Sequence, residues 1–526
     1  MDHKILPLLF IATSCFGAIA FEDLSLEEQV GQVLMVHFRG ETANEDAKTL
    51  IHEAHVGGII YYNWANGLTS PTQVQTLSSG LQRLAQKTPK AIPLLIAADQ
   101  EGGLVARLQS GFTQFPGNRA LGETGDPSLA EKAAFAMGEE LRAVGIQMSL
   151  SPVVDVNMNP RNPVIGIRSF GDDPEVVTRF GEHALRGFQK AGILATVKHF
   201  PGHGDTTVDS HEDLPVIDKS FAELEKGEFV PFAHLVTAAE TVMTAHLMVP
   251  ALDPDHCSTL SAKTLHFLRD ALKFKGLIVT DSLVMEGVLK KCGSVDEAAI
   301  QALNAGCDLL ILGGRSLNSN RVGSELTTAD VIRVHRNLVA AVKSGRISKE
   351  RLHDAVDKIL ALKERYLPDD EGSLANVYTE AHRNLAKEIA SRALKTTGSP
   401  VSLSGQNVLI VAPSLLKSTI EQTSMFQIAT PYYFEGLNPL NSEEAIRQAE
   451  FADAIVVCSN NAWKNPGAKE LTDALCKSGK PVIVLCLRDP LDGALFPEAS
   501  CVMTSFSPTV ASIQAICDQL DIRDLL

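Results

Sequence analysis

The chain of 526 residues lacks an excess of positive charge, and its formal net charge is −16. An acidic chain without a basic stripe is a poor match for nucleic acid or an anionic membrane, so we expect neither as a partner. Its nine cysteines include no Cys-x-x-Cys pair, which argues against a zinc ribbon or redox motif and favours mostly free thiols. No segment after the N-terminal region is long and apolar enough to span a bilayer. We find no internal repeat and no low-complexity tract, and we expect a monomer without a cofactor.

The N-terminal region has the pattern of a targeting segment. A charged start, Met-Asp-His-Lys, precedes an apolar run from Ile5 to Ala20 that ends in Ala-Ile-Ala. A short apolar core with a small-residue exit is typical of a cleavable secretory signal, so we expect residues 1–20 to direct export to the periplasm or the cell exterior. The alternative is a first helix that stays in the fold and leaves the protein in the cytoplasm.

Short apolar runs alternate with helical patterns from residue 21 to 366. The runs are rich in Val, Ile and Leu on both faces, as strands of a covered parallel sheet are. Eight such units predict a (β/α)8 TIM-type barrel, with a doubly wound open sheet as the alternative. The predicted strands are Val33–Phe38, Gly58–Tyr62, Leu94–Ala98, Met148–Val156, Leu194–His199, Val242–Leu247, Leu277–Asp281 and Leu309–Leu312.

Polar residues at the ends of these runs favour the barrel. In a barrel the carboxyl ends of all strands form one mouth, so residues far apart in sequence converge there. An open sheet would gather only some of them. The residues in question are Asp99, Asp155, Lys198, His199, His246 and Asp281.

A charged, turn-rich segment after the barrel predicts a domain boundary, with a linker over 367–379. A helix over 380–394 should open a smaller C-terminal αβα domain that extends from 380 to 526. Its predicted strands are Val408–Ala412, Ala454–Cys458, Val482–Leu487 and Cys501–Thr504.

The densest group of titratable residues follows the fifth apolar run. Residues 198–205 read Lys-His-Phe-Pro-Gly-His-Gly-Asp, and Asp209 and His211 follow. Polar groups this dense at a strand exit indicate a cleft that contacts a ligand, although a surface loop with chance polar residues is the bland alternative. In an extended loop Asp209 and His211 point the same way, so the carboxylate can orient the imidazole for proton transfer. The alternative is a helix-capping Asp-Ser with an idle histidine.

Asp281 ends the seventh run and is placed to attack a group held above the mouth, unless it merely caps the next helix. The three histidines at 199, 203 and 211 raise the question of a metal. Pro201 and Gly202 break the His-x-x-x-His spacing, however, so no helix holds that pair on one face, and we expect no metal.

Three residues outside the loop are candidates for substrate binding. Asp99 can accept two hydrogen bonds from neighbouring sugar hydroxyls, and a Gly-Gly pair after it allows a close backbone approach. Arg107 and Arg168 are nearby cations, and taken individually each could equally be a surface salt-bridge residue.

Together these motifs resemble glycoside hydrolase family 3 β-N-acetylglucosaminidases of the NagZ type, in their two-domain form. The resemblance covers the whole predicted barrel, and the Asp-Ser-His element at 209–211 is its most specific part. It implies a retaining mechanism with Asp281 as nucleophile and an Asp209–His211 dyad as acid and base. It further implies a substrate-binding set made of Asp99, Arg107, Arg168, Lys198 and His199.

The implied substrate is a cell-wall fragment with β-linked N-acetylglucosamine at its non-reducing end. Two departures from the family pattern could alter substrate preference: Ser282 follows the nucleophile where an Asp is usual, and Leu104 stands where Arg often follows the Gly pair. Two other functions remain open. One is phosphorolysis of the same bond by the same residues, and the other is a non-catalytic wall-binding barrel.

Overall fold

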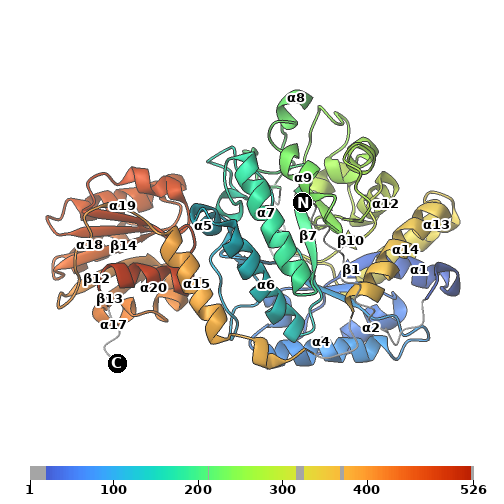
Figure 1. Cartoon of the computed structure of the whole chain (residues 1–526), viewed down its shortest axis with the longest axis horizontal. Helices are drawn as coiled ribbons and strands as arrows, with labels where there is room; N and C mark the ends of the chain where they lie inside the picture. The colour runs from blue at the N-terminus through green and yellow to red at the C-terminus, as the bar shows by residue number, and fades with distance from the viewer. Residues whose placement is uncertain (1–18, 211–212, 316–324, 368–371, 523–526) are drawn as a thin grey trace, which may run out of the picture.

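The protein is described here by a computed structural model that covers residues 19–210, 213–315, 325–367 and 372–522. The predicted signal therefore lies almost entirely outside the described residues, and so does His211. Two bodies are visible in Figure 1, a barrel and a smaller orange-to-red domain beside it. Within the described ranges, no helix is both long and apolar enough to cross a membrane.

Eight parallel strands form the first body, in the order β10-β1-β2-β3-β6-β7-β8-β9. A parallel bridge between Val279 and Leu309 joins the two ends of this sheet, so the sheet closes and the open-sheet alternative is wrong. The bounds are β1 Leu34–Val36, β2 Gly58–Tyr61, β3 Leu95–Ala98, β6 Met148–Ser149, β7 Leu194–Phe200, β8 Thr241–Thr244, β9 Leu277–Val279 and β10 Leu310–Ile311.

All eight predicted strands are confirmed, but seven are shorter than predicted, and β6 and β8 fall short most at their carboxyl ends. β6 ends at Ser149 because Pro152, which has no N–H to donate, follows soon after. Beyond β8, the residues up to Leu247 lie outside the strand, and Leu247 accepts hydrogen bonds from Ser258 instead. Both departures fall at the carboxyl ends of strands, where the chain turns into the loops of the mouth.

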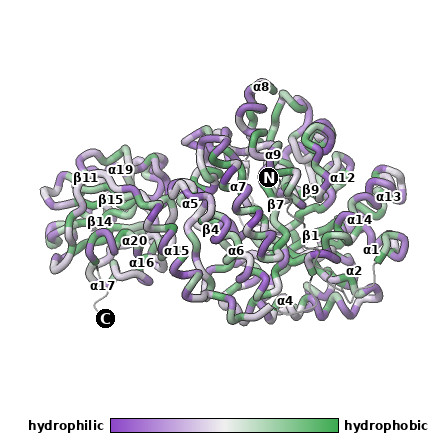
Figure 2. Tube along the Cα trace, in the orientation of Figure 1, coloured by the Kyte–Doolittle hydropathy of each residue, from purple (hydrophilic) through white to green (hydrophobic). Residues whose placement is uncertain are grey.

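Helices surround the barrel and bury one face each against it. Asp126 is the N-cap of α6 and Asp173 is the N-cap of α7, and each is followed by a proline at the first helical position. Figure 2 shows hydrophobic colour along the central strands and mixed colour along these helices. They are α1 Leu26–Gln32, α2 Glu45–Glu53, α4 Pro71–Ala85, α6 Pro127–Ala143, α7 Pro174–Lys190, α9 Phe229–Leu235, α10 Ala262–His266, α12 Val295–Ala305, α13 Thr328–Lys343 and α14 Lys349–Tyr366.

Short elements decorate the mouth of the barrel. A two-stranded antiparallel hairpin, β4 with β5, follows β3 directly. The short elements are β4 Gln100–Gly102, β5 Val105–Ala106, α3 Asn63–Asn66, α5 Asn118–Glu123, α8 Phe221–Leu224 and α11 Glu286–Cys292.

The second body is a six-stranded mixed sheet with helices on both faces, in the order β11-β16-β15-β14-β12-β13. Side chains of β12 alternate between two separate apolar clusters, one under α20 and one under α18 and α19, which confirms an αβα sandwich. The bounds are β11 Lys395–Gly398, β12 Val408–Pro413, β13 Ala429–Phe434, β14 Ala454–Ser459, β15 Val482–Cys486, β16 Cys501–Thr504, α15 Glu380–Ala393, α16 Lys417–Ile420, α17 Met425–Ile428, α18 Pro439–Ala449, α19 Pro466–Cys476 and α20 Val510–Gln519.

The two bodies meet along α15 and the loop after β16 (Figure 1). Phe506 of that loop packs with Ala120 and Ala393, and the Arg119 guanidinium lies 5.9 Å from its ring centroid. The Ser507 hydroxyl accepts a hydrogen bond from the Gly117 N–H at 3.4 Å. The C-terminal domain thus contacts the segment around Gly117 and Ala120, which packs against the β4–β5 hairpin.

Candidate active site

The residues predicted at strand ends meet at the carboxyl end of the barrel. Asp99 follows β3 directly, Lys198 and His199 lie near the carboxyl end of β7, and Asp281 lies two residues after β9. Parallel strands of one barrel end at one mouth, so the ends of these three strands contribute to a single site.

Asp99 lies between two cations. Its carboxylate accepts hydrogen bonds from Arg107 at 2.9 Å and from the Lys198 ammonium at 3.0 Å. Burial favours the protonated acid, but Lys198 and Arg107 outweigh burial and hold the pKa of Asp99 well below its ordinary value. Asp99 is therefore a fixed negative acceptor that both Arg107 and Lys198 contact.

Glu101, which sequence reasoning did not single out, is the second carboxylate of this cluster. Arg168 donates to both of its oxygens at 2.9 Å, and the Lys198 ammonium lies 2.7 Å from one of them. Although burial opposes ionisation, Arg168 and Lys198 lower the pKa of Glu101 to about 2. Arg168 is thus a buried partner of a mouth carboxylate and not a surface residue. The signal was present in the Asp-Gln-Glu sequence of the turn.

Lys198 joins the two carboxylates and is almost completely buried, with 2% of its side chain exposed. Burial would lower the pKa of an ammonium, yet Asp99 and Glu101 raise the pKa of Lys198. Three cations therefore face two carboxylates. The result is a rigid polar wall whose remaining donor and acceptor positions suit the hydroxyl groups of a sugar.

His199 is oriented by Asp155, which the sequence placed at the mouth of the barrel but not among the catalytic or binding residues. Asp155 accepts from the His199 N–H at 3.2 Å and lies 2.7 Å from Nδ1 of the ring. It also accepts from the His203 N–H at 2.7 Å. Burial favours protonation, but His199 outweighs it and lowers the pKa of Asp155. The other ring nitrogen of His199 lies 3.4 Å from Arg168, which brings His199 into the same wall.

Asp281 is held at the start of the loop after β9. Its carboxylate accepts from the Ser282 N–H at 2.7 Å, while its own N–H donates to Thr244 at 3.2 Å. His246 supports this loop by contacting the Ser282 carbonyl at 2.9 Å. The capping alternative for Asp281 fails because α11 begins only at Glu286 and has Met285 at its N-cap.

Tyr62 is close enough to both Asp99 and Asp281 for their charges to act on its phenol. Burial raises the pKa of its phenol, and the carboxylates of Asp99 and Asp281 both raise it further, which places Tyr62 within electrostatic range of each. The Arg107 guanidinium lies 5.4 Å from its ring centroid, and Trp64 stacks on it at 5.1 Å. Sequence reasoning missed this aromatic wall, because tyrosine at the end of an apolar strand looks like a core residue.

The proposed acid and base are only partly described. His211 lies outside the described residues, so its position relative to Asp281 stays a prediction. Asp209 is described, and its carbonyl accepts a hydrogen bond from the Asp213 N–H at 3.0 Å.

No group of three His, Cys, Asp or Glu side chains suited to a metal ion occurs among the described residues. Two described residues of the loop that could have served as metal ligands have other partners. His199 contacts Asp155, and Asp205 pairs with Lys219 at 2.7 Å.

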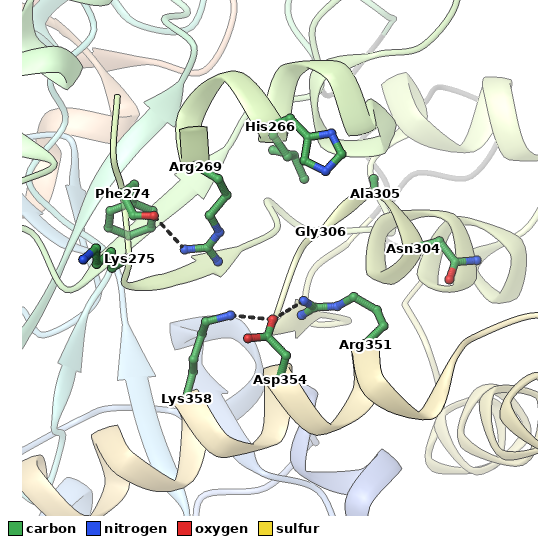
Figure 3. A pocket seen from close by; sticks show the side chains of 11 residues that line it. His266, Arg269, Phe274, Lys275, Asn304, Ala305, Gly306, Arg351, Asp354 and Lys358 are labelled. Atoms are coloured by element: carbon green, nitrogen blue, oxygen red, sulfur yellow. Dashed lines mark hydrogen bonds and ion pairs between the residues drawn. The ribbon is translucent and has the colours of Figure 1, made fainter. Parts of the chain in front are cut away.

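A pocket of about 440 Å³ lies at the opposite end of the barrel (Figure 3). Its lining includes Phe274, which precedes β9, and Gly306, which precedes β10, so it opens at the amino ends of the strands. Arg351 and Lys358 of its wall both pair with Asp354. In this fold the amino ends serve stability, so we assign no chemistry to this pocket.

Comparisons with known proteins show which family the chain belongs to. Residues 25–362 match the family model described as the glycosyl hydrolase family 3 N-terminal domain. The chain is 33% identical over 492 residues to Beta-hexosaminidase A of Pseudoalteromonas piscicida, which covers 83% of this chain and 80% of that protein. It is 34% identical over 286 residues to a Beta-hexosaminidase of Nitrosomonas eutropha, which covers 53% of this chain and 80% of the relative.

A solved structure extends the likeness to both bodies. The family 3 β-N-acetylglucosaminidase from Paenibacillus sp. str. FPU-7 matches with a TM-score of 0.85 and 35% identity, over 94% of this chain and 96% of that one. The chain therefore belongs to glycoside hydrolase family 3 and is a β-hexosaminidase of that family.

Proposed function

We propose that this enzyme is a retaining exo-β-N-acetylglucosaminidase that removes terminal β-linked N-acetylglucosamine from peptidoglycan fragments. The observation that supports the proposal most is the arrangement at the mouth. Asp281, after β9, is within electrostatic range of Tyr62, and so is Asp99, which Lys198 joins to Glu101 in the polar wall.

In the first step an Asp281 carboxylate oxygen attacks the anomeric carbon, and the bond from that carbon to the glycosidic oxygen breaks. His211 gives its proton to the departing oxygen, so the aglycone leaves as an alcohol. In the second step water attacks the anomeric carbon of the ester. His211 takes a proton from the water, and Asp281 leaves as the carboxylate.

The binding residues have distinct tasks in this scheme. Asp99, Arg107 and Lys198 would hold the sugar hydroxyls, with the carboxylate as acceptor and the cations as donors. With Nδ1–H of His199 donated to Asp155, Nε2 would serve as an acceptor, shared between Arg168 and a sugar hydroxyl. A fixed wall of this kind orients the anomeric carbon for attack without reorganisation during the reaction.

The test is hydrolysis of p-nitrophenyl N-acetyl-β-glucosaminide by the purified full chain. We expect nitrophenol release by wild type, and a loss of about 10³-fold or more in kcat for Asp281→Ala. Circular dichroism should show that this variant is folded. If wild type cleaves the corresponding glucoside as fast as the N-acetyl compound, recognition of the acetamido group is refuted.

Phosphorolysis is distinguished by running the same reaction with and without inorganic phosphate. N-acetylglucosamine as the sole sugar product in both buffers supports hydrolysis. N-acetylglucosamine 1-phosphate, formed only with phosphate, would instead identify a phosphorylase.

The natural aglycone that we propose is N-acetylmuramic acid or its anhydro form, and mass spectrometry of products from defined muropeptides tests it. Export by residues 1–20 belongs to the same proposal, since such fragments arise at the cell wall. Mass spectrometry of the mature N-terminus checks cleavage after Ala20.

A further inference from the structure

His203 lies in the signature loop but has no role in the scheme above. Its side chain is buried with 2% exposure, and its ring contacts two hydroxyls. Nδ1 lies 3.0 Å from the Thr206 hydroxyl, and Nε2 lies 3.0 Å from the Ser210 hydroxyl. Since both ring nitrogens have partners within the loop, neither is available to a sugar.

The imidazole is built to stay neutral. Burial lowers the pKa of His203 to about 4, so the ring is uncharged at neutral pH. A neutral imidazole has one donor and one acceptor, and hydroxyl groups can serve as partners to either. The ring therefore bridges Thr206 and Ser210 without a counter-charge, and it is a poor proton donor.

The backbone of the same loop is fixed at its base. The His203 N–H donates to Asp155 at 2.7 Å, and Asn162 donates to the His203 carbonyl at 2.8 Å. Position 204 admits only glycine, since a Cβ there would lie 1.7 Å from the Val156 carbonyl oxygen. His203 thus connects a rigid base, shared with Asp155, to Ser210, which directly precedes His211.

The far side of the loop is tied to the element that follows the nucleophile. The Gly287 N–H of α11 donates to the Ser210 carbonyl at 3.3 Å. Lys290 of the same helix pairs with Asp213 at 3.0 Å. Ser210 is therefore held through its side chain by His203 and through its carbonyl by α11.

We propose that His203 is a positioning residue for the acid and base of this enzyme. By holding the Ser210 hydroxyl, it anchors the residue that precedes His211 in the sequence, and proton transfer by His211 to the glycosidic oxygen should depend on this anchor. The inference rests on the proposed function, because it concerns the residue assigned there as acid and base.

Leaving-group dependence tests this role. An activated aglycone such as 2,4-dinitrophenol departs without a proton, whereas phenol needs one. A displaced acid should therefore lower kcat/KM for the phenyl glycoside and spare kcat/KM for the dinitrophenyl glycoside. A fault in sugar binding or folding would lower both.

Two variants remove the contact from opposite ends. His203→Asn keeps a polar atom near Thr206 but cannot reach Ser210, and Ser210→Ala removes the hydroxyl while leaving His203 intact. We expect each to lower kcat/KM for phenyl N-acetyl-β-glucosaminide by about tenfold or more, with the dinitrophenyl value within about threefold of wild type. The double variant should be no worse than the poorer single variant, because both remove one interaction.

Two further variants serve as controls. His203→Gln reaches toward Ser210 and should lie closer to wild type than His203→Asn. His234→Asn, at an exposed site on α9, should behave as wild type. In the second step His203→Asn should lack a well-placed base, so its kcat with the dinitrophenyl glycoside should fall even though kcat/KM does not. Added azide should restore that kcat and give a glycosyl azide, because azide needs no base.

His211→Ala, measured in parallel, separates the two ways of failing. If His211→Ala shows the leaving-group dependence and both loop variants lack it, the positioning role is wrong and the proposed function stands. If His211→Ala lowers kcat/KM equally for both substrates, the acid and base assignment is wrong, and the positioning role of His203 is wrong too. An equal loss with both substrates in His203→Asn and Ser210→Ala also overturns the role.

Discussion

At the scale of single residues, the mouth of the barrel depends on Glu101. Its carboxylate is buried and forms ion pairs with both Arg168 and Lys198. Removing one member of a buried ion pair leaves the other charges uncompensated, which is far more costly than losing an exposed pair.

We therefore predict that Glu101→Gln lowers kcat/KM on the N-acetyl substrate by about tenfold or more and lowers the free energy of unfolding by about 3–5 kcal/mol. Steady-state kinetics and urea unfolding measure the two effects. The matched control is Glu45→Gln, since Glu45 is exposed and pairs only with Lys48 at 3.0 Å. Equal effects at the two positions would contradict the role of Glu101.

Sequence reasoning reached Asp99, Lys198, His199 and Asp281 because each stands where an apolar strand ends. It did not reach Glu101 or Tyr62. Glu101 lies in β4, a three-residue strand without an apolar pattern, and Tyr62 continues a strand whose other residues are buried. Only the folded barrel shows that both face the same polar wall, because their partners are distant in sequence.

At the scale of elements, α15 is fastened to α6 by His382. Its ring lies 2.9 Å from Glu140 and 3.3 Å from Glu139. Glu140 also accepts from Thr113 and from the Tyr378 N–H. Burial alone would lower the pKa of His382, but Glu140 and Glu139 outweigh it and raise that pKa.

This shift has a defined sign. A raised folded-state pKa gives stability that is fully present below the unfolded value of about 6.5 and is lost as pH rises through the folded-state value. We predict that the difference in Tm between wild type and His382→Gln is larger at about pH 6 than at about pH 9. Differential scanning calorimetry at both pH values checks it. His353→Gln, on the exposed face of α14, should show no such change.

The elements themselves were predicted well in the barrel and less completely in the smaller domain. Its β11 and β13 were missed. β11 reads Lys-Thr-Thr-Gly and is largely exposed, and β13 contains Pro431 and is only half-buried. Both are edge strands, where neighbours supply the pairing and the apolar signal is weak.

At the scale of the whole molecule, the C-terminal domain supports the site from behind. Ser507 contacts Gly117, and a Cβ on Gly103, at the tip of the hairpin that carries Glu101, would lie 3.3 Å from the Ser507 hydroxyl. The domain therefore limits how far this hairpin can move.

We predict that Phe506→Ala, which removes the largest side chain of this contact, raises KM for the N-acetyl substrate by about threefold or more and changes kcat less, because the binding wall loosens while Asp281 does not move. Steady-state kinetics measure the split. Phe426→Ala, at an exposed position of α17, is the matched control and should change neither constant. A pure loss of kcat would contradict a supporting role in binding.

All eight cysteines in the described part of the chain are free thiols, and six of them are buried. Burial raises the pKa of Cys257 to about 12, so its thiol is protonated and a slow nucleophile. Packing, without covalent cross-links among these residues, must hold both bodies together. A bacterial cytosol with its glutathione pool should accordingly yield the same folded product as an oxidising secretory route, and recombinant production can dispense with a disulfide isomerase.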